Sequence, residues 1–190
     1  MTTELAPVNL ARTYTSAEFE ELPDAGQHYE LIRGKLSKMP PTGDEHGRIG
    51  KKLLKWLLFH DPEEKLGQVW FTTGFVLDKD NTLEPDLMFV AASRVPKLSK
   101  KALDIIPDLV VEVWSPSDLR SQKERDNASA KIKIYQNAGV KLIWSIFPDN
   151  QTVQVYEGKA GPKTLSATDT LGGGEIIPGF NIKISELFSV

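Results

Sequence analysis

The sequence predicts an α/β (α+β) fold: a central mixed β-sheet flanked by helices, with a β-hairpin near the N-terminus. Residues 107–116 (PDLVVEVWSP) indicate a buried central strand, because β-branched side chains dominate them and alternate with period two. Two stretches, residues 46–60 and a segment that ends at Ala138, have apolar side chains at helical spacing. Strand-like runs lie between and after these helices, which is the pattern of a sheet covered by helices.

Length and composition are those of one folded unit. The chain has 190 residues, of which 40% are hydrophobic, and no long uninterrupted apolar run. We therefore expect a flexible lead-in at residues 1–13 and a single domain at residues 14–190. No internal repeat or linker divides this domain, and no stretch predicts a membrane span.

The N-terminus has neither the basic nor the apolar segment of a signal peptide, so we expect a cytoplasmic protein. The absence of cysteine excludes disulfides, thiolate metal sites and cysteine nucleophiles. A net charge of −3 and a pI near 5.7 give no overall attraction to nucleic acid. Any binding of nucleic acid must therefore come from a local basic patch.

The first predicted elements are a short helix and a hairpin. Residues 15–23 predict the helix, with Ser16 as its cap. Residues 29–39 (YELIRGKLSKM) predict the hairpin, because two apolar-rich arms flank a turn signal at Arg33 and Gly34. Glu30 shares a strand face with Ile32, which would point its carboxylate inward. A solvated carboxylate on the strand surface is the alternative.

Residues 46–60 predict an amphipathic helix that packs on the sheet, with Asp44 or Thr42 as its cap. Its apolar stripe consists of Ile49, Leu53, Trp56 and Leu57. His46 lies one turn before Ile49 on the buried side, where it could reach a site in the sheet. Packing or hydrogen bonding at the helix end is the alternative role for this histidine.

Two strands, residues 69–77 and 86–90, should follow and form a hairpin around the polar turn at residues 78–81. Pro85 cannot donate to a sheet and is tolerated at a strand start, so Asp86 should lie where the second strand enters the sheet. The loop beyond this strand is rich in cations: Arg94, Lys97, Lys100 and Lys101. It is either a solvated connection or a rim that faces phosphate groups, if the neighbouring acids hold metal.

Glu112 places a carboxylate in the middle of the buried strand, on the same face as Val110 and Trp114. An ionised carboxylate in such surroundings must find a cation, a metal ion or a hydrogen-bond donor, or else take up a proton. A purely structural salt bridge, or a strand end that reaches solvent, is the alternative to a functional acid.

The helix that ends at Ala138, with Gly139 as its C-terminal signal, contains a second misplaced charge. At about 100° per residue, Lys131 lies near the centre of the apolar arc formed by Ala128, Ile132, Ile134, Tyr135 and Ala138. Lys133 projects to the opposite side. Lysine is rarely buried without a partner, so Lys131 and Glu112 explain each other if helix and strand pack together. The alternative is a lysine whose amine reaches solvent along the helix surface.

The last third of the chain predicts smaller elements. Residues 142–147 and 152–156 predict strands around a turn at residues 148–150, and residues 171–174 predict a glycine-rich turn. Residues 184–188 form a short amphipathic tail.

The order of these elements resembles the PD-(D/E)XK nuclease superfamily. Pro85 and Asp86 match the first half of its signature, and Glu112 matches the acid of the second half. Trp114 replaces the lysine that normally lies two residues after this acid, but many members carry the lysine on the following helix, where Lys131 lies.

More specifically, the chain is similar to a bacterial family of restriction-endonuclease-like proteins, the Uma-two family, over about residues 14–188. The matching motifs are YELIRG at 29–34, MPP at 39–41 followed by His46, EPD at 84–86, PDLVVEVWSPSD at 107–118, Lys131 with Tyr135, Gly139 with Val140, and PGF at 178–180.

This resemblance implies a restriction-endonuclease-like fold and a metal-dependent endonuclease site for nucleic acid, DNA before RNA. Asp86 and Glu112 would hold Mg²⁺ or Mn²⁺, because these ions prefer hard oxygen ligands and fill their shell with water and phosphate. Lys131 would orient the attacking water or stabilise the developing charge. Glu30, holding a second ion or a water, and His46, contacting the phosphate, should line the pocket less closely. Trp114 should only pack, since an indole cannot replace an ammonium group.

Two other functions fit the same residues. A non-catalytic scaffold or interaction module would keep the acids and Lys131 as a buried ion-pair network, and would bind no divalent ion. A hydrolase of a small phosphorylated molecule would use the same site, which the acidic pI favours. The basic loop, together with Arg120, Lys123 and Arg125, favours nucleic acid instead.

We also expect a homodimer, because cutting both strands of a duplex usually needs two active sites and two-fold pairing is the commonest soluble assembly. The tail at residues 184–188 and the hairpin that begins at Tyr29 have the most apolar surface to cover.

Overall fold

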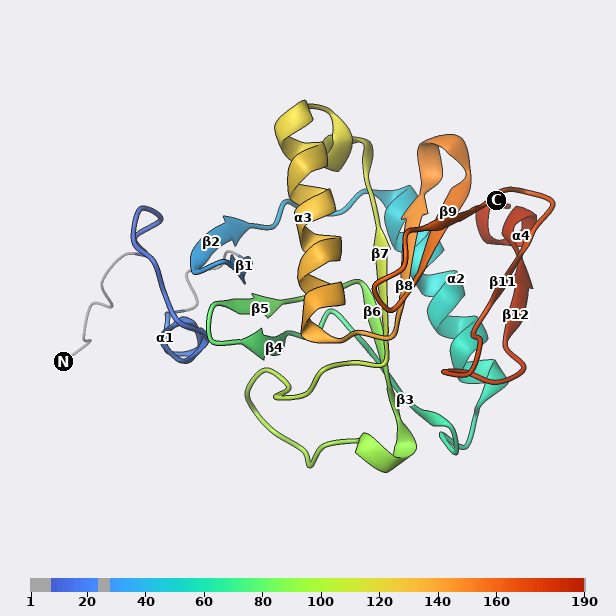
Figure 1. Cartoon of the computed structure of the whole chain (residues 1–190), viewed down its shortest axis with the longest axis horizontal. Coiled ribbons are helices and arrows are strands. Elements are labelled where there is room, and N and C mark those ends of the chain that lie inside the picture. Colours follow the sequence, from blue (N-terminus) through green and yellow to red (C-terminus); the bar gives the residue numbers. More distant parts are fainter. Residues whose placement is uncertain (1–7, 24–27, 190) are drawn as a thin grey trace.

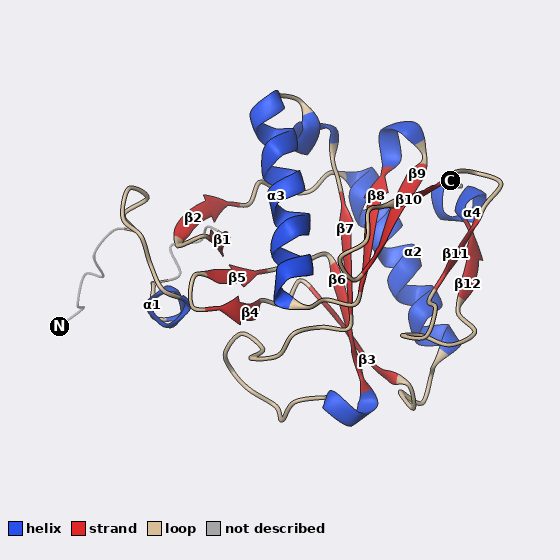
Figure 2. Ribbon diagram, viewed as in Figure 1, coloured by secondary structure: helices blue, strands red, loops and turns tan. Residues whose placement is uncertain are grey.

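A six-stranded mixed sheet forms the centre of the computed structural model, which describes residues 8–23 and 28–189 (Figures 1 and 2). The strand order is β10-β9-β8-β7-β6-β3. The bounds of these strands are β3 Gly67–Phe71, β6 Leu87–Ala91, β7 Leu109–Val113, β8 Leu142–Phe147, β9 Thr152–Glu157 and β10 Lys163–Leu165.

The middle strand, β7, connects the two halves of this sheet. It runs antiparallel to β6 and parallel to β8. Parallel neighbours need a crossover, and helix α3 (Gln122–Ala138) provides it, ending at Gly139 in the left-handed conformation. Short 3₁₀ turns follow β6 (Ala92–Arg94), β7 (Pro116–Leu119) and β8 (Pro148–Asn150).

Helices cover both faces of the central sheet (Figure 1). Helix α2 (Asp44–His60) packs on one face, where its buried side chains meet Leu109, Val111 and Val113 of β7. The same layer contains β11 (Thr170–Gly172), β12 (Asn181–Lys183) and α4 (Ile184–Phe188). Helix α3 packs on the other face, against Val110 and Trp114 of β7. Period-two alternation thus sends Glu112 toward α3.

A second, four-stranded sheet with the order β2-β1-β5-β4 lies on the α3 side of the molecule. Its strands are β1 Tyr29–Ile32, β2 Lys35–Lys38, β4 Phe75–Asp78 and β5 Asn81–Leu83. The predicted N-terminal hairpin is present as β1 and β2. Arg33 and Gly34 both have positive φ (52° and 72°), which matches the twist of a two-residue hairpin turn.

The strand predicted at residues 69–77 is wrong, because the chain leaves one sheet for the other in the middle of that range. Thr72 has a φ of 43° and lies between β3 and β4. Strand β3 pairs with β6, whereas β4 pairs with β5, so the expected hairpin does not form. The apolar pattern continues across the break, since both pieces bury side chains, and it gave no sign of the change of sheet.

Two predicted helix caps are also corrected. Thr15, not Ser16, caps helix α1 (Ser16–Glu20), in a reciprocal arrangement with Glu18. The Ser16 hydroxyl instead donates to the backbone carbonyl of Asp78 at 2.7 Å. Gly43 is the N-cap of α2, which has no side-chain cap from Thr42 or Asp44.

Apolar side chains of the two segments expected at a dimer interface are packed in the core of the same chain. Ile184 and Leu187 are fully buried in the core, as is Leu31 of the hairpin. Of the predicted lead-in, residues 1–7 lie outside the described residues. Within the described part of the chain, no helix has the length and apolar character that crossing a bilayer requires.

Candidate active site

Glu112 is the fourth of the five residues of β7 and is 5% exposed. Its Oε1 accepts a hydrogen bond from Nζ of Lys131 at 2.9 Å and one from the hydroxyl of Tyr135 at 2.5 Å. Both donors come from the buried face of α3. The structure therefore brings together the two charged groups that were out of place in the sequence pattern.

Lys131 is 8% exposed and forms ion pairs with two carboxylates, Glu112 and, at 2.8 Å, Glu30. Burial acts to lower the pKa of Lys131, but the attraction of the two carboxylates outweighs it and raises the pKa above its usual value. Lys131 is therefore protonated at neutral pH. It can act as a cation and as a hydrogen-bond donor, but not as a base.

Burial raises the pKa of Glu112 to about 7, even though Lys131 acts to lower it. Repulsion by Asp86 and Glu30 adds to the rise, while the hydrogen bond from Tyr135 opposes it. One lysine is thus not enough to hold this carboxyl fully ionised. A further positive charge at this place would stabilise the ionised form.

Glu30 links the small four-stranded sheet to the acid cluster, which consists of Glu30, Glu84, Asp86 and Glu112 with Lys131, Tyr135, His46 and Ser115. Its Oε1 accepts from Lys131 and, at 2.8 Å, from the backbone N–H of Glu84, and its exposure equals that of Glu112. The expectation that Glu30 lines the pocket less closely is wrong, because Lys131 lies between Glu30 and Glu112 and contacts both. The alternative of a solvated strand carboxylate is excluded by the same contacts.

Asp86 bridges strand β6 to strand β7 and helix α2. It follows buried Pro85 at the entrance of β6, as the sequence predicts. Its Oδ2 accepts from the backbone N–H of Val113 at 2.7 Å, next to Glu112, and its Oδ1 lies 2.6 Å from Nε2 of His46. The Asp86 side chain is 22% exposed, so the cluster reaches solvent on this side.

His46 is likewise closer to the centre than expected. It lies in the first turn of α2, and its Nδ1 is 3.3 Å from the hydroxyl of Ser115 while Nε2 meets Asp86. Burial acts to lower the pKa of His46, but the hydrogen bond and charge of Asp86 outweigh it and raise the pKa. His46 therefore orients Asp86 and supplies a second positive charge to the cluster.

The cluster nevertheless contains more acids than bases. Glu84 is a further carboxyl in it, and burial raises its pKa, with repulsion from Glu30 and Asp86 acting in the same direction. Among the described residues, no group of three or more acidic or histidine side chains could by itself hold a metal ion. An ion would rely on Asp86 and Glu112, with water and substrate oxygens completing its shell, which is the way magnesium usually binds. Surplus negative charge and hard oxygen ligands therefore fit Mg²⁺ or Mn²⁺.

The basic loop does not form a rim of this site. Arg94 forms an ion pair with Asp108 at 2.6 Å, and Lys101 forms one with Glu20 of α1 at 3.0 Å. Asp108 precedes β7, whereas Glu112 lies near the end of that strand, so these cations serve the opposite end of the sheet. The interpretation of this loop as a phosphate-facing rim is thus wrong for Arg94 and Lys101.

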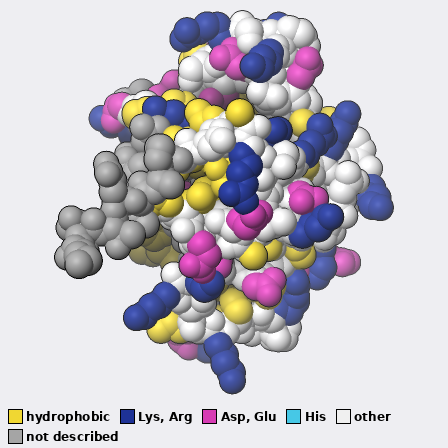
Figure 3. Space-filling view, turned by 90° about the vertical axis from the view of Figure 1, so that its left-hand side faces the viewer, with side chains coloured by type: hydrophobic (Ala, Val, Ile, Leu, Met, Phe, Trp, Pro, Cys, Tyr) yellow, Lys and Arg dark blue, Asp and Glu magenta, His cyan; other side chains and the backbone are white. Residues whose placement is uncertain are grey.

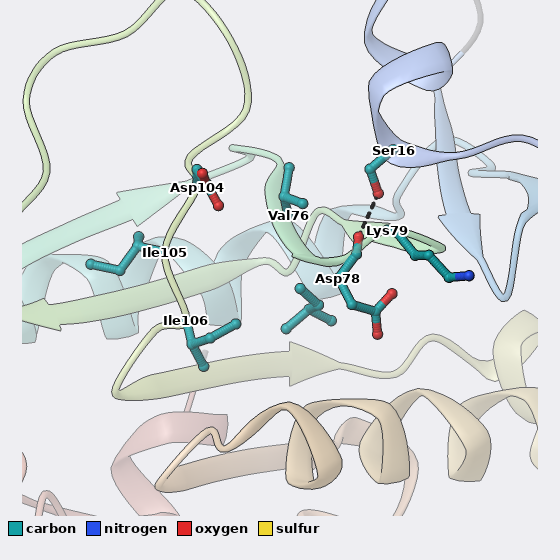
Figure 4. A pocket seen from close by; sticks show the side chains of 8 residues that line it. Ser16, Val76, Asp78, Lys79, Asp104, Ile105 and Ile106 are labelled. Carbon is teal, nitrogen blue, oxygen red and sulfur yellow. Dashed lines mark hydrogen bonds between the residues drawn. The ribbon is translucent and has the colours of Figure 1, made fainter.

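A surface hollow of about 500 Å³ is also separate from the cluster. It lies between α1, β4 and residues 104–106, where Figure 4 shows the hydrogen bond from Ser16 to Asp78. None of its lining residues belongs to the buried acid cluster. The candidate site is therefore identified by its charged side chains and not by a surface hollow.

On the face that carries the small sheet, cationic and anionic side chains are intermingled (Figure 3).

Sequence reasoning missed several members of the cluster. Tyr135 was assigned to the apolar arc, and its hydroxyl gave no separate signal. Ser115 and Glu84 flank predicted residues in the sequence but have no periodicity that distinguishes them. Trp114 behaves as expected: it is buried, and its Nε1 donates to the hydroxyl of Ser145 at 2.6 Å.

Comparisons with known proteins agree with this architecture. A family model described as Uma2, putative restriction endonuclease, matches residues 16–185. Among solved structures, the chain is similar to a putative nuclease of the DUF820 family from Anabaena variabilis, with 22% sequence identity and a TM-score of 0.80. The match covers 92% of this chain and 97% of the other, and confirms the predicted fold. No curated protein matches significantly.

Proposed function

Because the chain belongs to the Uma2 family of putative restriction endonucleases, we propose that it is a divalent-metal-dependent endonuclease that hydrolyses phosphodiester bonds of DNA. The observation that carries this proposal is the buried pair of Glu112 and Lys131 beside Asp86, in a cluster with surplus negative charge. The carboxylates of such a cluster repel one another, which disfavours their ionised forms, and a bound cation relieves this repulsion.

Asp86 and Glu112 are the residues that would hold the ion. When bound, Mg²⁺ or Mn²⁺ supplies Lewis-acid chemistry, because it neutralises charge on the phosphodiester and makes water more nucleophilic at neutral pH. Hydrogen bonds from Val113 N–H and His46 hold Asp86 in place, and bonds from Lys131 and Tyr135 hold Glu112. The carboxylates are therefore oriented before any ion or substrate arrives.

Lys131 would act on the substrate as a permanent cation. Its raised pKa keeps the amine protonated, so it orients the attacking water or stabilises negative charge that builds on the phosphate. Glu30 restrains this lysine from the other side. In place of the predicted second ion or phosphate contact, we therefore propose that Glu30 and His46 orient Lys131 and Asp86.

The cations best placed for a nucleic-acid backbone are Arg120 and Lys123, which are exposed near the start of α3 and follow the turn after Ser115. Since Ser115 contacts His46, this turn borders the open side of the cluster. Backbone contacts of this kind are electrostatic and weaken with salt.

A cleavage assay with purified protein tests the proposal. Single-stranded, duplex and branched DNA, and RNA, are incubated with Mg²⁺ or Mn²⁺, with EDTA and with Asp86→Asn protein as controls. We expect metal-dependent cleavage of DNA that both controls abolish. Cleavage that persists in EDTA or in Asp86→Asn would refute this site. If the protein hydrolyses small phosphate esters and not DNA, its substrate is a small phosphorylated molecule.

One observation favours a non-catalytic scaffold instead: Glu30, Asp86 and Glu112 each have a hydrogen-bond donor within the chain. A closed ion-pair network of this kind can exist for structure alone. Mn²⁺ titration by calorimetry separates the two functions, because a scaffold needs no divalent ion at these carboxylates.

We further propose that the protein acts on duplex DNA as a homodimer, since cutting both strands needs two sites. Three apolar side chains of the segments first suggested for this contact, Leu31, Ile184 and Leu187, are buried within the chain, so the contact would rest on other side chains. Light scattering at micromolar concentration gives the mass. A monomer would limit the proposed substrate to single strands or to one strand of a duplex.

A further inference from the structure

Tyr135 is an uncharged residue of the acid cluster and has no place in the predicted site. It follows Lys131 by one turn on the buried face of α3 and is fully buried. Its ring stacks on Phe75 of the small sheet, with centroids 6.0 Å apart and planes 13° from parallel. Packing thus fixes the ring, and the hydroxyl has a defined direction.

That direction is toward Glu112. The Tyr135 hydroxyl lies 2.5 Å from Oε1, the same oxygen that Lys131 contacts at 2.9 Å. Two donors on one oxygen fix the rotation of the carboxylate and leave Oε2 as the oxygen that a cation can approach. Lys131 alone would not do this, because it divides its hydrogen bonds between Glu112 and Glu30.

The uncharged hydroxyl of Tyr135 suits this task. A phenol that donates but bears no charge can direct a carboxylate without competing with a metal ion for it.

We infer that Tyr135 is a positioning residue for the metal-ligating carboxylate: its hydroxyl and Lys131 hold one oxygen of Glu112, so that the other oxygen is presented to the divalent ion. This inference rests on the proposed function and assigns a role to a residue outside the acid-lysine set. Partners of this kind behind a metal ligand typically change metal affinity or activity by about 10- to 100-fold when removed.

The test uses Tyr135→Phe in the full chain, with Tyr156→Phe as its matched control. Tyr156 also bears a hydrogen-bonded hydroxyl, which donates to Gln154 at 2.8 Å, but it takes no part in the cluster. Calorimetric titration with Mn²⁺, at a temperature where both variants are folded, should show about tenfold weaker binding in Tyr135→Phe. Tyr156→Phe should bind Mn²⁺ as tightly as the wild type.

A purely structural tyrosine would lower thermal stability and leave the affinity for Mn²⁺ unchanged, and that result overturns the inference while the proposed function stands. Absence of Mn²⁺ binding by the wild type overturns the proposed function and this inference together. If Tyr135→Phe does not fold, wild-type protein labelled with 3-fluorotyrosine replaces it. Mn²⁺ should broaden one of its four tyrosine ¹⁹F resonances at the lowest concentrations, and uniform broadening contradicts the inference.

Discussion

Two buried carboxylates, Asp108 just before β7 and Glu112 within it, show what distinguishes a structural acid from a candidate functional one. Asp108 is 1% exposed and forms ion pairs with Arg94 at 2.6 Å and with Lys141 at 2.7 Å. Burial acts to raise its pKa, but the N–H of Ala91 and the two cations outweigh burial and lower it. Glu112 shares one lysine with Glu30, and its pKa is raised.

Burial is therefore not the difference between these two acids, because both are almost completely covered. The difference is the local balance of charge. Asp108 has two cations for one carboxylate, so its charge is compensated within the chain. Glu112 belongs to a group in which carboxylates outnumber cations, and that group is stable with an additional positive charge. The surplus of acid, rather than the buried position, identifies the candidate site.

The largest expected effect is on catalysis, in the pair of variants Glu112→Gln and Asp108→Asn. Both keep the side-chain shape and remove a charge. Glu112→Gln should lower nuclease activity by roughly a thousand-fold, because a positioned electrostatic group is lost from the site. Asp108→Asn should retain activity at temperatures where it is folded. Cleavage assays on both proteins, with circular dichroism to confirm folding, measure this contrast. Equal losses would mean that charge balance does not separate the two acids.

The next largest effect should be on stability, when the lysine that pairs with each acid is removed. Lys131→Met leaves Glu30 and Glu112 buried without their partner, which typically lowers the free energy of unfolding by about 3–5 kcal/mol. Lys141→Met should lower it by no more than about 1 kcal/mol, since Lys141 is mostly exposed and Arg94 still pairs with Asp108. Urea denaturation at neutral pH measures both values. A small loss in Lys131→Met would show that solvent already compensates the cluster.

Added metal should stabilise only proteins with an intact acid cluster. At about 100 times its dissociation constant, a ligand that binds the folded state alone adds about 2.7 kcal/mol to the free energy of unfolding. We expect Mn²⁺ to raise the melting temperature of the wild type and of Asp108→Asn, and EDTA to reverse the effect. Glu112→Gln should show no such rise. A rise in this variant would place the ion elsewhere.

Sequence reasoning predicted this site through its physical anomalies. Glu112 in a strand and Lys131 on an apolar helix face each break a local pattern, and one contact resolves both. Asp108 lies in the same motif but precedes the strand, so periodicity gave no reason to expect it to be buried. Its partners, Arg94 and Lys141, are far from it in sequence, and such a contact leaves no periodic trace.

The fold was predictable for similar reasons. Its prediction failed where these reasons do not apply. Helices and central strands have long periodic patterns, and the Uma-two resemblance ordered them correctly, as the family and fold comparisons confirm. The break at Thr72 was not predictable, because apolar side chains continue across it: Val69 and Trp70 of β3 are partly buried, and Phe75 and Leu77 of β4 are buried in a different sheet. Likewise, the role of Tyr135 depends on which way one hydroxyl points, which composition and spacing do not specify.

The last expected effect is the opposite pH dependence of the two acids. The pKa of Glu112 is about 7 in the folded chain, against 4.5 for an ordinary glutamate. Between these values the folded state holds a proton that the unfolded state has lost, so stability should fall as the pH rises, by at most about 1.4 kcal/mol per pH unit. The pKa of Asp108 is below its ordinary value of 3.8. Its contribution is complete above that value and is lost only as the pH falls further.

Unfolding by urea in EDTA-containing buffer from pH 3 to pH 8 measures both effects as differences from the wild type. Glu112→Gln should lack the decline between about pH 4.5 and pH 7, so its stability relative to the wild type should rise across that window. Asp108→Asn should approach wild-type stability only as the pH falls below 3.8, the ordinary value, because the pKa of Asp108 is lower than that. Parallel curves for Glu112→Gln and wild type would show that Glu112 has the same protonation in the folded and the unfolded chain across this window, and that burial and the neighbouring acids do not raise its pKa.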